Sequence, residues 1–274
     1  MNTRPPGLLL VGCGKMGGAL LSGWLARKIA TGPIHVVEPS SASLAAFRAR
    51  ADIAFHADVS EIADDAAPAV VLFAVKPQGM EKIVPAYRRF VRPRTVFLSI
   101  AAGRTIGFFE SHLGRAAAVV RAMPNTPAAV ARAITVATAN ARVTESQKAQ
   151  CNALLSAVGE VTWIAEEEQL DAVTAVSGSG PAYVFLLVEC LAAAGVEAGL
   201  PAELAMRLAR ATIAGAGELL HRDGSPAAVL RQNVTSPGGT TAAALSILMA
   251  KDGLQPLLTR AVIAAAKRSR ELAG

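Results

Sequence analysis

The chain has 274 residues, of which 52% are hydrophobic, 18% are charged and only 4% are aromatic, and its formal net charge is +6. This length suits one large or two medium domains, and the composition supplies a sizeable core of Ala, Val, Leu and Ile. The basic residues are scattered and few aromatic rings could stack on bases, so we expect no nucleic-acid partner.

Three further absences narrow the class of protein. Cys13, Cys151 and Cys190 are odd in number and lack metal-ligand spacing, so we expect buried thiols and no metal. Residues 1–7 lead directly into the first predicted strand, without a signal peptide. Charge or glycine interrupts the apolar stretches before about 18 residues, so we expect no membrane span and a cytoplasmic protein.

The first motif is a glycine turn between a strand and a helix. Apolar residues 8–11 run into Gly12-x-Gly14-x-x-Gly17, and a helix is predicted from about Met16 to Ala30. Gly12 allows the tight turn, Gly14 leaves room for a pyrophosphate, and Gly17 lets the helix pack closely on the strand. The helix N-terminus offers unpaired N–H groups to phosphates. This order predicts dinucleotide binding; a turn without a ligand is the alternative.

Strands and helices alternate through the first half of the chain. Strands are predicted at 34–37, 69–75, 95–100, 118–122, 133–137 and 161–164, and helices at 43–50, 78–90 and 105–113. Another helix starts at the capping box Thr144-x-x-Gln147 and stops at Gly159. This alternation predicts an α/β fold, with a doubly wound parallel sheet of the Rossmann type over residues 1–165.

Small residues and prolines follow these predicted strands. The turns are Glu38–Ser41, Lys76–Pro77, Ala101–Gly103 and Met123–Pro127. Because the carboxyl ends of parallel strands share one edge of the sheet, these turns favour a groove for an extended cofactor. Ordinary turn chemistry is the alternative.

The cofactor preference depends on the residues after the second strand. Glu38 lies roughly 20 residues beyond the glycines, where an acid can bind the ribose 2′-OH of NAD and would repel a 2′-phosphate. Ser40 and Ser41 could donate to such a phosphate, although no Arg stands immediately beside them. The pattern leans slightly towards NADH, and both cofactors stay open.

After about residue 165, Ala-rich helical periodicity replaces the strand-like runs, so we predict an all-helical domain over residues 166–274. Pro181, Pro201 and Pro226 each fit a first helical turn. Residues 181–194 carry only one charge, and a helix that is apolar all round needs cover on every side. The remaining helices are too few to provide that cover, which predicts an intertwined homodimer.

Two polar islands interrupt the helical half, at residues 177–183 and 235–241. The second island is a glycine turn that opens onto a helix. Its N–H groups, with the hydroxyls of Ser236, Thr240 and Thr241, would form an anion site of carboxylate size. An ordinary helix N-cap is an equally supported interpretation.

The helical half lacks the usual acid–base side chains of an alcohol dehydrogenase. No lysine lies between Lys148 and Lys251, and the only histidine there is His221. An alcohol substrate usually needs such a group for its hydroxyl proton, although Tyr183 is present. This absence favours a protonated cyclic imine, whose nitrogen already carries the proton.

Six motifs in this order resemble those of the pyrroline-5-carboxylate reductases. They lie at residues 11–17, 74–77, 99–103, 121–127, 176–183 and 236–241, so the resemblance runs nearly end to end. It implies a Rossmann domain, a helical dimerisation domain, and the reduction of 1-pyrroline-5-carboxylate to L-proline with NADPH or NADH, the final step of proline biosynthesis. It also implies that the helical site meets the cofactor across a protomer boundary, and that dimers can assemble into a decamer of five dimers.

The residue patterns and the resemblance together assign a set of site residues. The cofactor-binding residues are Gly12, Cys13, Gly14, Lys15, Met16, Gly17, Glu38, Ser40, Ala74, Val75, Lys76, Pro77, Ile100, Ala101, Ala102 and Asn125. The substrate-binding residues are Ser177, Ser179, Ser236, Gly238, Gly239, Thr240 and Thr241. The resemblance implies that Thr241 points its hydroxyl at the ring nitrogen, as the candidate catalytic residue. Glu38 departs from the small polar residues, or the Asn-Arg pair, of many members and argues against their usual NADPH preference.

Two other classes of function stay open. The first is another NAD(P)H-dependent imine reductase or a β-hydroxyacid dehydrogenase of similar build, and the missing lysine argues against the hydroxyacid version. The second is a non-catalytic dinucleotide-binding regulator, which would not need the second polar island.

Overall fold

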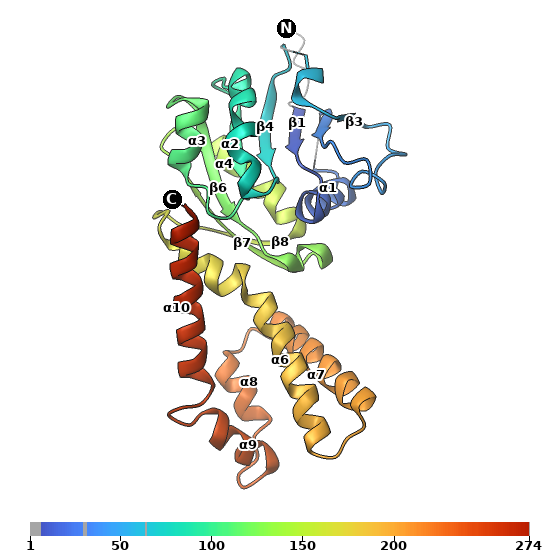
Figure 1. Ribbon diagram of the computed structural model, residues 1–274, viewed down its shortest axis with the longest axis vertical. Coiled ribbons are helices and arrows are strands. Elements are labelled where there is room, and N and C mark those ends of the chain that lie inside the picture. The colour runs from blue at the N-terminus through green and yellow to red at the C-terminus, as the bar shows by residue number, and fades with distance from the viewer. Residues whose placement is uncertain (1–6, 30–31, 64, 274) are drawn as a thin grey trace. The chain divides into compact units, whose positions relative to one another are not determined.

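The computed structural model describes the whole chain except residues 1–6, 30–31, 64 and 274 (Figure 1). The chain forms two compact units, Met1–Gly178 together with Ala265–Gly274, and Ser179–Ala264. The sequence prediction divides the chain after residue 165 instead. Residues 166–178 and the end of the chain pack with the sheet unit because Leu170 is fully buried and Ser269 donates to Asp171 at 2.6 Å.

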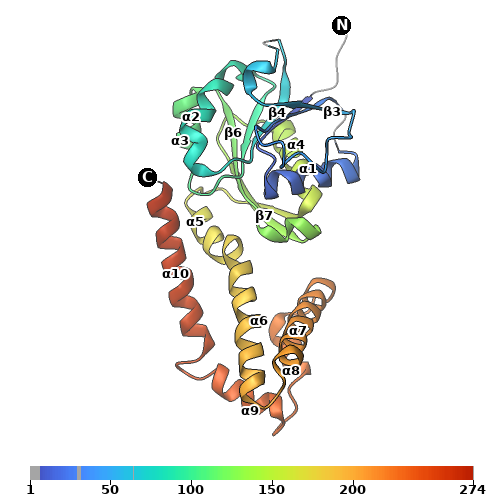
Figure 2. The ribbon, with the colours of Figure 1, turned by 45° about the vertical axis from the view of Figure 1, so that its right-hand side comes forward.

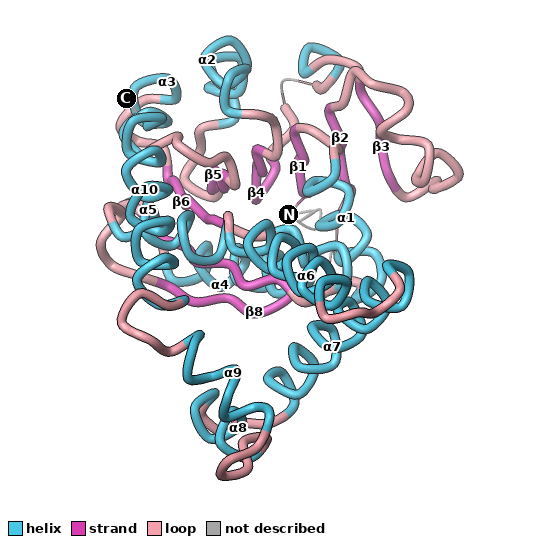
Figure 3. Tube along the Cα trace, turned by 60° about the horizontal axis from the view of Figure 1, so that its bottom comes forward, coloured by secondary structure: helices cyan, strands magenta, loops and turns pink. Residues whose placement is uncertain are grey.

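The first unit is built on one eight-stranded sheet in the order β3-β2-β1-β4-β5-β6-β7-β8, whose strands form the magenta layer of Figure 3. The strands are β1 Gly7–Val11, β2 Ile34–Val37, β3 Ile53–His56, β4 Pro68–Phe73, β5 Val96–Ser99, β6 Ala118–Met123, β7 Ala133–Ala139 and β8 Gly159–Trp163. Neighbouring strands are parallel except β6 and β7. The predicted Rossmann-type sheet is confirmed, with one antiparallel pair and the unpredicted strand β3.

Both faces of the sheet are covered, as the strand sequences require. Alternate side chains of β1 enter opposite cores: Leu8 and Leu10 pack on one face, Leu9 and Val11 on the other. The first core contains residues of α1 (Lys15–Arg27) and α4 (Glu145–Leu155). The second contains residues of α2 (Met80–Ile83), the 3₁₀ helix Val84–Phe90 and α3 (Ile106–Leu113). Burial on both faces explains why β4 is apolar throughout.

Local turns shorten several predicted helices. Helix α1 ends at Arg27 because Lys28 adopts a left-handed conformation with φ 53°, and Ala30 lies outside the described residues. The helix predicted at 43–50 is wrong, since that segment forms successive turns. Most of the segment 78–90 is 3₁₀ rather than α-helix. The predicted capping box of Thr144 and Gln147 is confirmed at the start of α4.

The second unit is all-helical, as predicted (Figure 2). Its helices are α6 Gly180–Glu197, α7 Ala202–Arg222, α8 Ala227–Asn233, α9 Thr240–Leu248 and the first part of α10 Leu254–Ala273. Small residues let α6 and α7 approach closely, and a Cβ at Gly195 would lie 3.1 Å from that of Ala205. Phe185 is nevertheless 62% exposed, and the described buried residues of this unit are only three alanines of α6 and α7. One chain therefore leaves most of this apolar surface uncovered.

One helical stretch bears on the expectation that the chain has no membrane span. Residues Gln169–Glu197 run as helix through α5 (Gln169–Val173), a π-helical turn and α6, with a mean hydropathy of 1.6. By length and composition the stretch could cross a membrane, because its few charges do not interrupt it as the sequence analysis assumed. This is weak evidence by itself, since a helix of a protein core passes the same test.

Candidate active site

The loops that follow β1, β4 and β5 begin side by side at one edge of the sheet. The main-chain hydrogen bonds of the sheet continue one residue beyond these strands. The N–H groups of Gly12, Ala74 and Ile100 each donate to the carbonyl of the last residue of the neighbouring strand, at 2.8–3.1 Å. These hydrogen bonds bring together three of the five segments predicted to bind the cofactor. The predicted common edge is therefore present.

The glycine turn has one glycine that the protein's own packing does not require. Gly12 has φ +91°, and a Cβ there would lie 2.7 Å from Val75 Cγ1. A Cβ at Gly17 would overlap the carbonyl oxygen of Gly12. Gly14, in contrast, has φ −68°, and a Cβ there would meet nothing within 4 Å. The missing side chain at Gly14 therefore leaves room for a group from outside the chain.

The start of α1 is suited to that group. Gly14 is the N-cap residue, and no side chain caps the helix. The first N–H groups of α1 therefore face a space without a Cβ, and with the helix dipole they fit a pyrophosphate. A groove of about 770 Å³ borders this end of α1 through Gly14 and Lys15, although neither Ala74–Pro77 nor Ile100–Ala102 lines it.

Glu38 joins the turns that follow β1 and β2. Its carboxylate accepts the N–H of Cys13 at 2.7 Å through Oε2 and the N–H of Ser40 at 2.8 Å through Oε1. Cys13 is 2% exposed, and burial, with a smaller contribution from the charge of Glu38, raises its thiol pKa to about 11. Cys13 thus offers its backbone, and not a reactive thiolate, to this site.

The other predicted cofactor residues differ in exposure. Lys15, Ser40 and Lys76 are exposed, whereas Ala101 is buried and donates its N–H to Ser99 Oγ at 3.2 Å. The partly buried residues are Met16, Ala74, Val75, Pro77, Ile100 and Ala102. The fixed main chain at Ala101 gives the loop after β5 a defined shape.

Asn125 is the most enclosed polar residue of the predicted set. Its amide donates to the carbonyl of Ser177 at 3.1 Å and accepts the N–H of Ile134 at 3.1 Å. The Ser177 hydroxyl donates to the carbonyl of Val173 at 3.0 Å, within the same helical segment. Asn125 therefore ties the loop after β6 to the segment that carries Ser177, and its contact with a cofactor stays a prediction.

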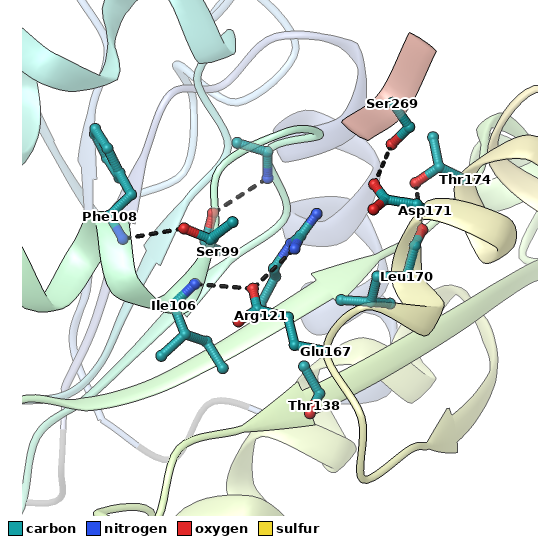
Figure 4. Close-up of polar contacts among 12 residues, drawn as sticks. Ser99, Ile106, Phe108, Arg121, Thr138, Glu167, Leu170, Asp171, Thr174 and Ser269 are labelled. Carbon is teal, nitrogen blue, oxygen red and sulfur yellow. Dashed lines mark hydrogen bonds and ion pairs between the residues drawn. The ribbon is translucent and has the colours of Figure 1, made fainter. Parts of the chain in front are cut away.

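The sequence analysis missed a buried ion pair beside this region (Figure 4). Arg121 Nη1, on β6, lies 2.8 Å from Glu167 Oε1, and the Arg121 side chain is 6% exposed. The same oxygen accepts the N–H of Ile106 at the start of α3, at 2.9 Å. An arginine inside an apolar strand requires an acidic partner, so the acidic run at 166–168 is a signal that could have revealed this pair.

The second glycine turn opens helix α9 in the helical unit. Gly239 is the N-cap residue and no side chain caps the helix, while Gly238 has φ +69°. Ser236, Gly238 and Thr240 are exposed, and Thr241 is partly buried. The uncapped N–H groups beside these hydroxyls have the chemistry to bind a small anion, and the carboxylate site itself stays a prediction. Ser179 lies apart from them in sequence, before α6, and its side chain does not cap that helix.

Comparison with known proteins decides the family. A model of the pyrroline-5-carboxylate reductase dimerisation domain matches residues 167–272, and a model of NADP oxidoreductases dependent on coenzyme F420 matches residues 8–103. The pyrroline-5-carboxylate reductase of Pseudomonas aeruginosa is 40% identical over 270 residues, which cover 98% of this chain and 97% of that protein. The chain belongs to the pyrroline-5-carboxylate reductase family.

Two solved structures of pyrroline-5-carboxylate reductases agree with this assignment. The enzyme of Coxiella burnetii has a TM-score of 0.90 at 33% identity, covering 99% of this chain and all of that chain. The enzyme of Plasmodium falciparum, with NADP bound, has a TM-score of 0.79 at 28% identity, covering 100% of both chains. The chain is therefore an oxidoreductase that uses NAD(P)H, and the predicted reduction of 1-pyrroline-5-carboxylate to proline is confirmed.

Proposed function

We propose that the chain carries out this reduction with two glycine turns that hold two different anions. The turn Gly12–Gly17 holds the pyrophosphate of NAD(P)H, and the turn Ser236–Thr241 holds the carboxylate of 1-pyrroline-5-carboxylate. The observation that carries the cofactor assignment is the open space beside Gly14, which the protein's own packing does not explain. Uncapped helix starts at both turns support the pair of assignments.

The substrate needs little acid–base help from the protein. The bound nicotinamide supplies the hydride, which adds to the imine carbon. The N–H groups at the start of α9 hold the carboxylate and so fix the orientation of the ring. Thr241 directs its hydroxyl at the ring nitrogen and accepts a hydrogen bond from the iminium N–H, whose proton stays on the nitrogen and becomes the amine N–H of the product. Such positioning can supply much of the rate acceleration, which is consistent with a helical half that has no lysine between Lys148 and Lys251.

The working form is a homodimer in this proposal. The matching model describes a dimerisation domain, and α6 exposes 62% of Phe185 and 57% of Leu186 in the single chain. A second copy would cover this apolar surface, which also accounts for the membrane-like composition of the stretch without a bilayer. A decamer of five dimers is the larger assembly. The protein works in the cytoplasm, without a membrane or a nucleic acid.

A cofactor-oxidation assay with product identification tests the proposed reaction. Purified protein is mixed with NADH or NADPH and with 1-pyrroline-5-carboxylate or other cyclic imines, and separately with NAD+ or NADP+ and a panel of β-hydroxyacids. We expect rapid oxidation of the cofactor with 1-pyrroline-5-carboxylate and L-proline as the product. Turnover only in the reverse direction, with a hydroxyacid and the oxidised cofactor, would contradict the assignment.

A further inference from the structure

We infer that Glu38 makes this reductase select NADH over NADPH. The inference rests on the proposed cofactor site. It goes beyond that site because family membership leaves the choice between the two cofactors open.

The main chain holds the Glu38 carboxylate in a fixed place. The Glu38 N–H donates to the carbonyl of His56 at 2.9 Å, which anchors the residue at the end of β2. One carboxylate oxygen accepts the N–H of Cys13 in the glycine turn, and the other accepts the N–H of Ser40 in the next loop. These two bonds join the loops after β1 and β2, between which a Rossmann fold binds the ribose of the adenosine half.

No described side chain neutralises the charge of this carboxylate. Among the residues that the structure describes, no Lys, Arg or His forms an ion pair with Glu38. Each carboxylate oxygen accepts one main-chain N–H and keeps further acceptor capacity. A ribose with two hydroxyls can donate to it. A 2′-phosphate carries negative charge and only acceptors at neutral pH, so the same carboxylate repels it.

Glu38 also occupies a donor that a 2′-phosphate would need. The N–H of Ser40 lies in the loop that carries the serine hydroxyls, and it already binds Glu38 at 2.8 Å. A phosphate could bind this N–H only by displacing the carboxylate. The two ligands therefore compete for one group, in addition to repelling each other.

Arg48 is a cation of this loop region that could act in the opposite direction. Its Nη2 donates to the carbonyl of Ser41 at 3.1 Å, seven residues earlier in the chain. This contact lies at the surface, where solvent and salt screen a guanidinium. We therefore expect the fixed carboxylate of Glu38 to outweigh Arg48, and a variant of each residue separates their effects.

The first test measures cofactor binding without turnover. Calorimetric titration of the full-length protein with NADH and with NADPH should give a Kd for NADH lower by about tenfold or more. Glu38→Ser should tighten NADPH and weaken NADH, and so shift the ratio of the two Kd values by about thirtyfold or more. Asp52→Asn is the control because it removes one carboxylate from the surface before β3, and it should leave the ratio unchanged.

Two further variants keep the inference falsifiable. Glu38→Gln removes the charge and keeps the size, so it should also shift the ratio towards NADPH even if Glu38→Ser fails to fold. Arg48→Ala should leave the preference for NADH in place. Tighter binding of NADPH by the unmodified protein, an unchanged ratio in folded Glu38 variants, or a preference set by Arg48 would each overturn the inference. A clear NADH preference in the titrations without reduction of 1-pyrroline-5-carboxylate would contradict the proposed function and leave this inference standing.

Discussion

Arg121 and Glu167 are 46 residues apart in the chain, yet their side chains meet at 2.8 Å within the sheet unit. Glu167 lies just before α5 and also accepts the N–H of Ile106, so it fixes the start of α3. The pair therefore connects β6, α3 and the segment that leads towards Ser177. It is the one described ion pair with an arginine side chain less than a tenth exposed.

Breaking this pair from one side should destabilise the sheet unit. Arg121→Met leaves a carboxylate that is 25% exposed without its cation, and loss of one partner of a buried pair costs ~3–5 kcal/mol. We expect about 2–3 kcal/mol less unfolding free energy in urea, because Glu167 keeps some contact with water. The double variant Arg121→Met/Glu167→Gln should recover part of the loss. Equal stability of Arg121→Met and the unmodified protein would refute this role.

Substitutions at two glycines of the first turn should affect different properties, one the cofactor affinity and the other the thermal stability. Gly14→Val should fold normally, since its Cβ meets nothing within 4 Å, but it should weaken cofactor binding by about tenfold or more. Gly17→Ala should instead lower the melting temperature, because its Cβ overlaps the carbonyl oxygen of Gly12. Thermal unfolding and calorimetry measure the two effects. Normal cofactor affinity in Gly14→Val would exclude this position from the pyrophosphate site.

Removal of the Thr241 hydroxyl should slow the reduction. Thr241→Ala should lower kcat/KM by about tenfold or more, a loss of at least ~1.4 kcal/mol of transition-state stabilisation, without changing the Kd of the cofactor. Thr241→Ser should restore most of the rate because it keeps the hydroxyl. Thr259→Ala is the control, because the Thr259 hydroxyl donates to the carbonyl of Gln255 within α10 and lies outside the proposed site. It should leave kcat/KM unchanged. Unchanged kinetics in Thr241→Ala would remove this residue from the mechanism.

Substitution in α6 should dissociate the proposed dimer. Sedimentation velocity at micromolar concentration should show a dimer or a larger assembly of the unmodified protein. Leu186→Asp introduces a charge at a residue that is 57% exposed in the single chain, and it should shift the protein towards monomer or reduce its solubility. A folded, monodisperse monomer of the unmodified protein would contradict the dimer.

Cys13 and Cys151 are buried as expected, whereas Cys190 is exposed in the single chain, contrary to the prediction of buried thiols. The buried thiol of Cys13 gives the expected dependence on pH. The pKa of Cys13 rises from 9.0 to about 11, so at pH 8 about one thiol in a thousand is ionised and alkylation should be slow. Its alkylation rate should increase with pH until about pH 11. Because the folded pKa lies above the unfolded value, Cys13 contributes stability that is fully present below pH 9 and is lost as the pH rises through 11. Comparison with Cys13→Ala isolates this contribution, and rapid labelling of Cys13 at pH 8 would contradict its burial.

The sequence predicted the features that depend on local pattern. The strand, glycine turn and helix at residues 8–27 follow from spacing alone, and so does the capping box of α4. It missed β3, whose short sequence Ile-Ala-Phe-His becomes a strand only by pairing with β2. The contacts of Arg48 with Ser41 and of Arg121 with Glu167 depend on how the chain folds back, so spacing could not predict them. The exposure of α6 in the single chain could not be predicted from local pattern, and the proposed second copy would account for it.

The most direct test of the reaction follows the hydride itself. The protein is given cofactor that carries deuterium at the transferable position of the nicotinamide ring, together with unlabelled 1-pyrroline-5-carboxylate. We expect L-proline with a single deuterium on the ring carbon that was doubly bonded to nitrogen, detected by mass spectrometry and NMR. Formation of proline without deuterium, or oxidation of the cofactor without proline, would contradict direct hydride transfer to the imine.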